Sequence, residues 1–150
     1  MGIGDQIKQR EFESELQKAI INIAFTNSYM SGLISNSFKV HNISIQQFNV
    51  LRILQGQHPK PVSINDITLR MVDKMSNASR LVDKLFTKSL ISRKSCSYDK
   101  RQVDISITPA GQSKLLELND LIAEVYSNHN HLTEEEFKTL NLLLDKLRLD

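Results

Sequence analysis

The amino-acid sequence predicts a mainly α-helical chain with one small β-hairpin, an α+β fold, on three observations. Apolar residues recur three and four positions apart through most of the 150 residues, as on the buried face of a helix. Only residues 90–94 and 103–107 favour strands, and the second segment alternates apolar and polar side chains. Residues that start helices precede most helical segments. With 40% hydrophobic residues, the chain is typical of one globular domain over residues 1–150.

The first part of the chain predicts helices, and the last of them has the clearest start and end signals. Residues 11–27 carry an apolar stripe on one helical face, and residues 29–37 predict further helix, broken near Gly32. Residues 44–47, Ser-Ile-Gln-Gln, fit a capping box, in which a hydroxyl and an amide side chain satisfy two backbone donors. The helix that this box opens should end within residues 56–61, which include one glycine and two prolines.

The middle of the chain predicts two short helices followed by the hairpin. Ser63 can cap a helix that runs to about Met71, and a second helix is predicted over residues 76–88. With residues 72–75 as the turn, the two form a helix-turn-helix. The two strands follow directly, with polar residues 97–102 between them, so the hairpin forms a wing beside the second helix.

The last third predicts two more helices. Thr108 and Pro109 suit the N-cap and the first position of a helix that should break at residues 128–131. Residues 133–136, Thr-Glu-Glu-Glu, form a capping box for the final helix. The apolar residues of the first of these helices form a narrow seam of the kind that packs against another helix.

Charge is concentrated in the middle of the chain. The net charge is +2, but residues 1–59, 60–101 and 102–150 carry +1, +6 and −5 respectively. A basic segment of this kind is the electrostatic signature of a polyanionic partner, although a solvated basic face would give the same count. The predicted architecture favours duplex DNA, because the major groove is about 12 Å wide and admits one helix. A basic hairpin tip would suit the minor groove, where the potential is most negative.

The sequence resembles the multiple antibiotic resistance regulator (MarR) family over roughly 70 residues without gaps. The resemblance is carried by Ser79–Leu85 in the second short helix, Leu90–Arg93 in the first strand, Asp99–Arg101 at the hairpin tip and Ile105–Gly111 after it, with Ser44–Leu51 upstream. Two positions depart from the family pattern. Val72 stands where a glycine is usual in the turn, and Ser89 stands where a glycine is usual before the first wing strand.

The resemblance implies a winged helix-turn-helix core over residues 44–111, flanked by N- and C-terminal dimerisation helices in residues 1–38 and 112–150. It also implies a homodimeric transcriptional regulator that binds a pseudo-palindromic operator in double-stranded DNA. Such a regulator represses or activates transcription, and repression is the favoured interpretation here. In many members of the family, a small aromatic effector binds in a cleft between the dimerisation helices and the winged core, and the DNA is then released. The sequence leaves open whether this chain has such an effector.

The candidate DNA-binding residues belong to the second short helix and the wing. By the resemblance, Arg101 enters the minor groove from the wing tip, and Asp99 orients it or another wing arginine by an ion pair. Candidates for base or phosphate contacts in the major groove are Ser76, Asn77, Ser79 and Arg80, and candidates for phosphate contacts are Lys84, Lys94 and Lys100. Each of these lysines also fits a solvated surface position.

Other functional classes find less support in the sequence. A winged-helix module that binds another protein, without specific DNA binding, is the alternative that stays open. The sequence shows no phosphate-binding loop, nucleophile elbow or metalloprotease motif, so we expect no enzyme, no cofactor and no metal site. Cys96 is interpreted as an inert thiol rather than a redox sensor, and His129 and His131 as loop residues. We expect a cytoplasmic protein that does not bind membranes.

Overall fold

The structure confirms the predicted mainly helical fold with one small hairpin. The computed structural model describes residues 1–95, 98 and 102–149. In chain order the elements are α1 (Ile3–Ile7), α2 (Glu15–Phe38), the 3-10 helix η1 (Lys39–His41), α3 (Ile45–Gln57), α4 (Ile64–Arg70), α5 (Ala78–Thr87), β1 (Ile91–Ser95), β2 (Val103–Ile107), α6 (Pro109–Asn128) and α7 (Glu134–Leu147).

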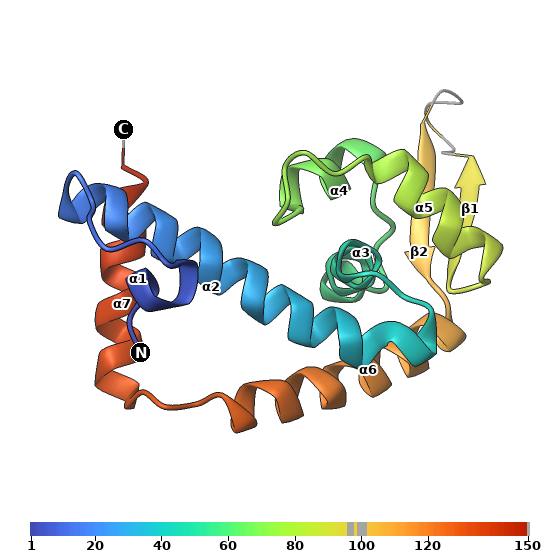
Figure 1. Ribbon diagram of the computed structural model, residues 1–150. Helices are drawn as coiled ribbons and strands as arrows, with labels where there is room; N and C mark the ends of the chain where they lie inside the picture. The colour runs from blue at the N-terminus through green and yellow to red at the C-terminus, as the bar shows by residue number, and fades with distance from the viewer. Residues whose placement is uncertain (96–97, 99–101, 150) are drawn as a thin grey trace.

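Two long helices connect two separate ends of the molecule. In Figure 1, α2 and α6 run across the molecule and pack against each other where they approach the elements α3 to β2, which we call the winged lobe. At the other end lie α1 and α7. The N- and C-termini both lie at this second end, far from the hairpin.

Side-chain caps fix where several helices begin. The hydroxyl oxygens of Ser44, Ser63, Thr108 and Thr133 each accept a hydrogen bond from the backbone N–H three residues further on. Ser44 and Thr133 also complete their capping boxes. Each cap satisfies an N–H that has no partner within its own helix. The sequence predicts all four starts, and the structure confirms them.

The predicted break in the first long helix is wrong. α2 runs without interruption over 24 residues, through Gly32. One glycine within a helix costs only about 1 kcal/mol relative to alanine, and packing against α6 and α3 supports this helix. The start predicted at residue 11 is also displaced, because Ser14 caps α2 by accepting a hydrogen bond from the backbone N–H of Gln17. The sequence pattern does not predict α1.

The hydrophobic core lies in the winged lobe and fixes it to the ends of α2 and α6. Phe38 from α2 and Leu118 from α6 are fully buried beside the lobe's own side chains. The largest fully buried side chains of the lobe are Leu51, Leu54, Ile67, Met71, Leu85 and Ile105. Burial of the long helices' ends in the same cluster places the helix-turn-helix at a defined angle to α2 and α6.

The hairpin is antiparallel and gains a third short partner. Ile91 pairs with Ile107 at its base, and Ser95 pairs with Val103 at the last described position of the ladder. Val62, just before α4, exchanges two backbone hydrogen bonds with Ile105, at 2.8 and 3.0 Å. The wing is thereby joined to the chain that enters the helix-turn-helix.

Ser89 adopts the left-handed backbone conformation that glycine favours. Its φ is 60°, and it directly follows Lys88, the C-cap of α5. The N–H of Ser89 donates to the carbonyl of Phe86, and the N–H of Leu90 donates to the carbonyl of Leu85. These two bonds form a Schellman motif, in which the residue after the C-cap is left-handed. The sequence therefore retains the family's turn geometry without its usual glycine.

A Ser89→Gly variant is expected to raise the free energy of unfolding by about 0.5–1 kcal/mol, because a left-handed non-glycine residue costs about 1–2 kcal/mol and the glycine loses only part of this to backbone entropy. Thermal denaturation followed by circular dichroism should show a higher midpoint. The matched control is Ser79→Gly within α5, which should lower the midpoint. A loss of stability in both variants would contradict the assigned strain.

Gly111 lets the first turn of α6 approach the chain that enters the wing. A Cβ built at Gly111 would lie 2.0 Å from the backbone oxygen of Leu90 and 2.8 Å from a side-chain carbon of Ile107. The same oxygen of Leu90 accepts a hydrogen bond from the N–H of Thr108 at 3.1 Å. The base of the wing and the start of α6 are therefore packed backbone to backbone.

Candidate nucleic-acid interface

The turn between α4 and α5 is held by side chains rather than by a glycine. The side-chain oxygen of Asn49 in α3 accepts a hydrogen bond from the N–H of Val72 at 2.9 Å. Asp73 accepts one from the N–H of Met75, also at 2.9 Å. The φ of Val72 is not positive, so this turn does not need the family's usual glycine. The two helices consequently form the predicted helix-turn-helix.

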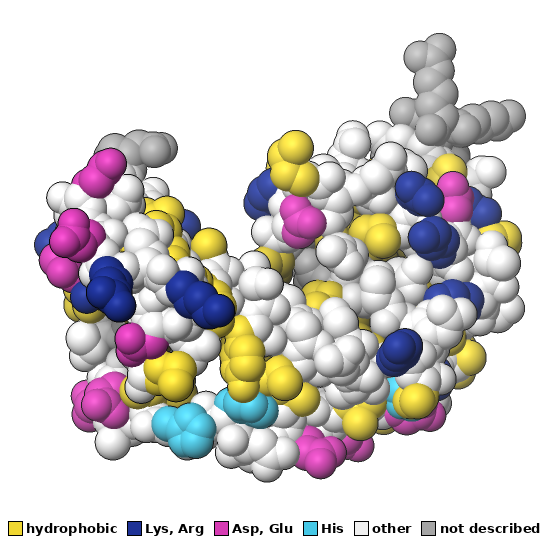
Figure 2. All heavy atoms as spheres, viewed as in Figure 1, with side chains coloured by type: hydrophobic (Ala, Val, Ile, Leu, Met, Phe, Trp, Pro, Cys, Tyr) yellow, Lys and Arg dark blue, Asp and Glu magenta, His cyan; other side chains and the backbone are white. Residues whose placement is uncertain are grey.

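α5 separates a buried face from an exposed polar face. Ala78, Val82 and Leu85 are buried against the lobe, as the sequence predicts. Arg80 and Lys84 lie four residues apart on the exposed side. Figure 2 shows Lys and Arg side chains gathered on the part of the winged lobe where α5 lies in Figure 1. The exposed face of α5 is therefore positively charged, and it belongs to one helix at the surface of the lobe.

The candidates at the start of α5 occupy three different environments. The Oγ of Ser76 is buried, without a hydrogen-bond partner in the described part of the chain. Asn77 is the N-cap, and its Oδ1 accepts a hydrogen bond from the N–H of Arg80 at 3.0 Å. The side chains of Ser79 and Arg80 are exposed. Asn77 therefore caps α5, a role that the sequence pattern does not indicate.

The wing candidates are only partly within the described residues. Lys94 lies exposed on β1, beside α5. Asp99, Lys100 and Arg101 lie outside the described residues, so their predicted roles at the tip stay predictions. The structure brings Arg80, Lys84 and Lys94 onto neighbouring elements of one lobe.

Arg93 was not among the predicted site residues, yet it joins the wing to α5. Its Nη1 lies 2.6 Å from the Oδ1 of Asp83, and its guanidinium carbon lies 4.0 Å from the centroid of the Phe86 ring. Strand alternation could have identified Arg93 from the sequence. In a strand, Arg93 lies on the same face as buried Ile91, whereas Lys94 lies on the other face. A planar guanidinium suits both an ion pair and an aromatic face. Arg93 is therefore a positioning residue.

A separate cavity of about 630 Å³ lies between α2, α3, α6 and the turn after α4. Its lining includes Ser31 of α2, Met71 of the turn and Tyr126 of α6. Arg52 and Phe48 of α3 also line it, with the guanidinium carbon 5.8 Å from the centroid of the ring. The cavity combines aromatic rings with one cationic group, Arg52, and one carboxylate, Asp73, and it lies where the winged lobe meets the long helices.

A third region, at the opposite end, is apolar. A groove of about 490 Å³ between α2 and α7 is lined by Ile23 and by Leu140, Leu143, Leu144 and Leu147. Every residue of α7 except Leu144 is exposed. The chain exposes 11069 Å², whereas a compact monomer of its mass exposes about 7,800 Å². The apolar groove between α2 and α7 is part of this exposed surface.

Two negative findings concern the described residues. In that part of the chain, no three His, Cys, Asp or Glu side chains are grouped as metal ligands would be. None of the described helices has the length and apolar character needed to cross a membrane.

The comparisons with known proteins agree on one family. The MarR family model matches residues 43–103. An uncharacterized HTH-type transcriptional regulator from Bacillus subtilis, YpoP, is 32% identical over 106 residues, which cover 70% of this chain and 74% of YpoP. The crystal structure of a MarR transcription factor from Planctomyces limnophilus is 26% identical, with a TM-score of 0.69 over 90% of this chain and 98% of that one.

Two more distant solved structures share the fold. A mutant MarR from E. coli complexed with operator DNA has a TM-score of 0.75 at 22% identity, over 93% of this chain and 100% of that one. Bordetella bronchiseptica BpsR, whose DNA binding is described as regulated by 6-hydroxynicotinic acid, has a TM-score of 0.76 at 19% identity, over 94% of this chain and 99% of that one. The helix-turn-helix, the wing and the similarity to YpoP lead to one conclusion: the chain belongs to the MarR family, whose members are transcription regulators and not enzymes.

Proposed function

We propose that the chain is a sequence-specific repressor that binds a pseudo-palindromic operator as a homodimer. The observation that carries this proposal is the exposed, positively charged face of α5 beside the wing, in a lobe held rigidly by its core. Ser79 and Arg80 are assigned to base contacts, and Lys84 and Lys94 to phosphates. Arg101 is assigned to the minor groove, with Asp99 as its orienting partner. Because an operator lies on the chromosome, this function places the protein in the cytoplasm.

The test is selection of bound duplexes from a random library, followed by affinity measurements at several salt concentrations. We expect a two-fold symmetric consensus and an affinity that falls steeply with salt, because phosphate binding releases counterions. Arg80→Ala should weaken binding by about 1–3 kcal/mol and relax specificity, whereas Lys94→Ala should weaken all sequences alike. Lys60→Ala, an exposed lysine that lies on neither α5, the wing nor the proposed dimerisation helices, is the control. Binding that ignores sequence and survives Arg80→Ala would favour the protein-interaction module instead.

The proposal of a homodimer is supported by the exposed apolar groove between α2 and α7. Residues 1–38 and 112–150 would supply the dimerisation helices, with residues 44–111 as the DNA-binding core. The chain exposes about 3,300 Å² more than the surface of a compact monomer, and a standard interface removes about 800 Å² from each partner. A second copy of this chain is the partner that a symmetric operator requires.

The cavity between α2, α3 and α6 is proposed to hold a small aromatic effector. Phe48, Tyr126 and Arg52 offer ring surfaces and a cation suited to an aromatic acid, the class to which the 6-hydroxynicotinic acid of BpsR belongs. Release of DNA requires the ligand to prefer one arrangement of the lobes. Titration with 6-hydroxynicotinate and benzoate should raise the melting temperature of the protein, and Arg52→Gln should reduce the rise. No rise with either acid would contradict an aromatic acid as effector.

A further inference from the structure

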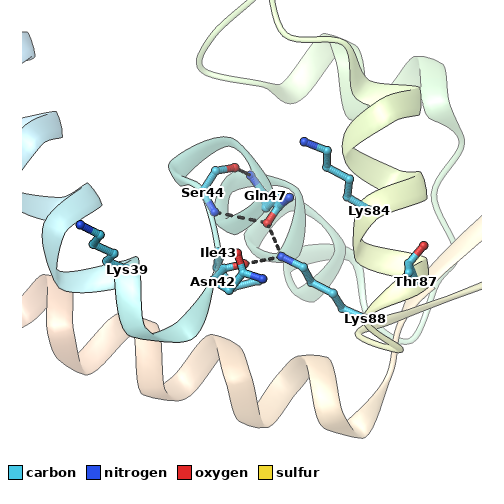
Figure 3. A pocket seen from close by; sticks show the side chains of 8 residues that line it. All are labelled: Lys39, Asn42, Ile43, Ser44, Gln47, Lys84, Thr87 and Lys88. Atoms are coloured by element: carbon cyan, nitrogen blue, oxygen red, sulfur yellow. Dashed lines mark hydrogen bonds between the residues drawn. The ribbon is translucent and has the colours of Figure 1, made fainter.

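A second, chemically different cavity lies between the start of α3 and the C-terminal half of α5. We call it the lysine cleft; its volume is about 590 Å³. Its lining includes Lys39 of η1, Asn42, Ser44 and Gln47 at the start of α3, and Lys84 and Lys88 of α5 and its C-cap. In Figure 3, Lys84 and Lys88 extend from α5 toward the start of α3, and Lys39 lies at the far rim.

Lys88 forms the floor of the lysine cleft. Its Nζ donates to the backbone oxygen of Asn42 and, at 3.2 Å, to the Oε1 of Gln47. Burial, and secondly the charge of Lys84, lower the pKa of the Lys88 ammonium from its ordinary value. Partial loss of water and the nearby like charge both disfavour the charged form of this side chain. Gln47, itself buried, fixes the ammonium in place.

The lysine cleft is electrostatically unbalanced. Three lysines line it, and its described lining residues include no carboxylate. The ion pairs found among the described residues use other lysines and arginines. α3 also begins here, at Ser44, and its first turn, Ile-Gln-Gln, carries no acidic side chain to offset the positive helix end. A bound anion would supply the missing negative charge.

We propose that the lysine cleft binds a phosphate-bearing anion, at a site distinct from the base-reading face of α5 and from the aromatic cavity. Ammonium groups bind phosphate as point charges, and the polar lining offers no aromatic surface for a ring. The phosphate can belong to the DNA backbone beside α5 or to a free small molecule. Either ligand would join α5 to α3 across the cleft.

Inorganic pyrophosphate, titrated calorimetrically into the full-length protein without DNA at low ionic strength, tests the site. We expect saturable binding that weakens at least tenfold in Lys84→Gln and in Lys88→Gln. Lys60→Gln, an exposed lysine between α3 and α4 that does not line the cleft, is the matched control and should bind normally. The side chain of Lys84 is exposed and makes no hydrogen bond within the described residues, so its variant decides the result if Lys88→Gln folds poorly. Absence of saturable binding, or an equal loss in Lys60→Gln, would overturn the proposal.

A second titration, with the protein saturated by its selected duplex, identifies the source of the phosphate. Exclusion of pyrophosphate by the duplex would assign the lysine cleft to the DNA backbone, and retained binding would assign it to a free ligand. Because the first titration contains no DNA, it stands apart from the proposed function. A protein that binds pyrophosphate but no duplex would disprove the operator proposal and leave the cleft intact.

Discussion

A Gly111→Ala variant should lose more than about 3 kcal/mol of folding stability, at the upper end for a single overpacking substitution. The added Cβ would lie 2.0 Å from the Leu90 carbonyl oxygen, a backbone atom that cannot rotate away. Relief of this contact requires α6 to move from the base of the wing, which also threatens the Thr108 hydrogen bond to the same oxygen. Chemical denaturation followed by circular dichroism measures the loss of unfolding free energy. Thermal denaturation should show a melting temperature lower by roughly 6 °C or more.

Gly56→Ala is the matched control for this result. Gly56 lies in α3, and a Cβ there meets nothing within 4 Å. The substitution should therefore stabilise the protein by about 0.5–1 kcal/mol, because alanine is the better helix former. If Gly111→Ala proved as well tolerated as Gly56→Ala, the backbone contact between α6 and the wing base would not exist in solution.

The second large effect is expected from Leu143→Asp, which should convert the proposed homodimer to a monomer. Leu143 is 57% exposed in the single chain and lines the apolar groove between α2 and α7. In a two-fold dimer each substitution occurs twice, and loss of an interface anchor costs about 2–4 kcal/mol each time, so the dissociation constant should rise more than about 1,000-fold. Light scattering after size-exclusion chromatography should report one chain of 17.1 kDa instead of two.

Leu69→Asp provides the control, because Leu69 is 74% exposed on α4 in the winged lobe. It introduces the same charge at an equally apolar surface position, at the end of the molecule remote from the groove. This variant should remain dimeric. A monomeric wild-type chain at micromolar concentration, or a Leu143→Asp protein that stays dimeric, would contradict the proposed interface.

Local sequence signals predicted the parts of the fold that local chemistry determines. The caps at Ser44, Ser63, Thr108 and Thr133 depend on residues within three positions of one another, so they can be identified without any tertiary contact. The continuity of α2 through Gly32 depends instead on packing against α6. Nothing near Gly32 in the sequence reports that contact, which explains the wrong prediction there.

The candidate site was predictable to the level of its elements. The sequence located α5 within two residues at its start, and its apolar face is buried as expected. The sequence did not reveal that Ser76 buries its hydroxyl or that Asn77 serves as the cap. It also missed the lysine cleft, although the four-residue spacing of Lys84 and Lys88 places both side chains on one helical face. Each of these properties depends on where a neighbouring element lies.

The attachment of Arg93 to Asp83 and Phe86 bears on the choice of DNA sites. These contacts hold β1 in one position relative to α5. In the proposed complex, α5 and the first wing strand would therefore approach the duplex as one unit. A new target site could exchange the bases that α5 contacts, while the phosphates that meet β1 would stay at the same distance from those bases.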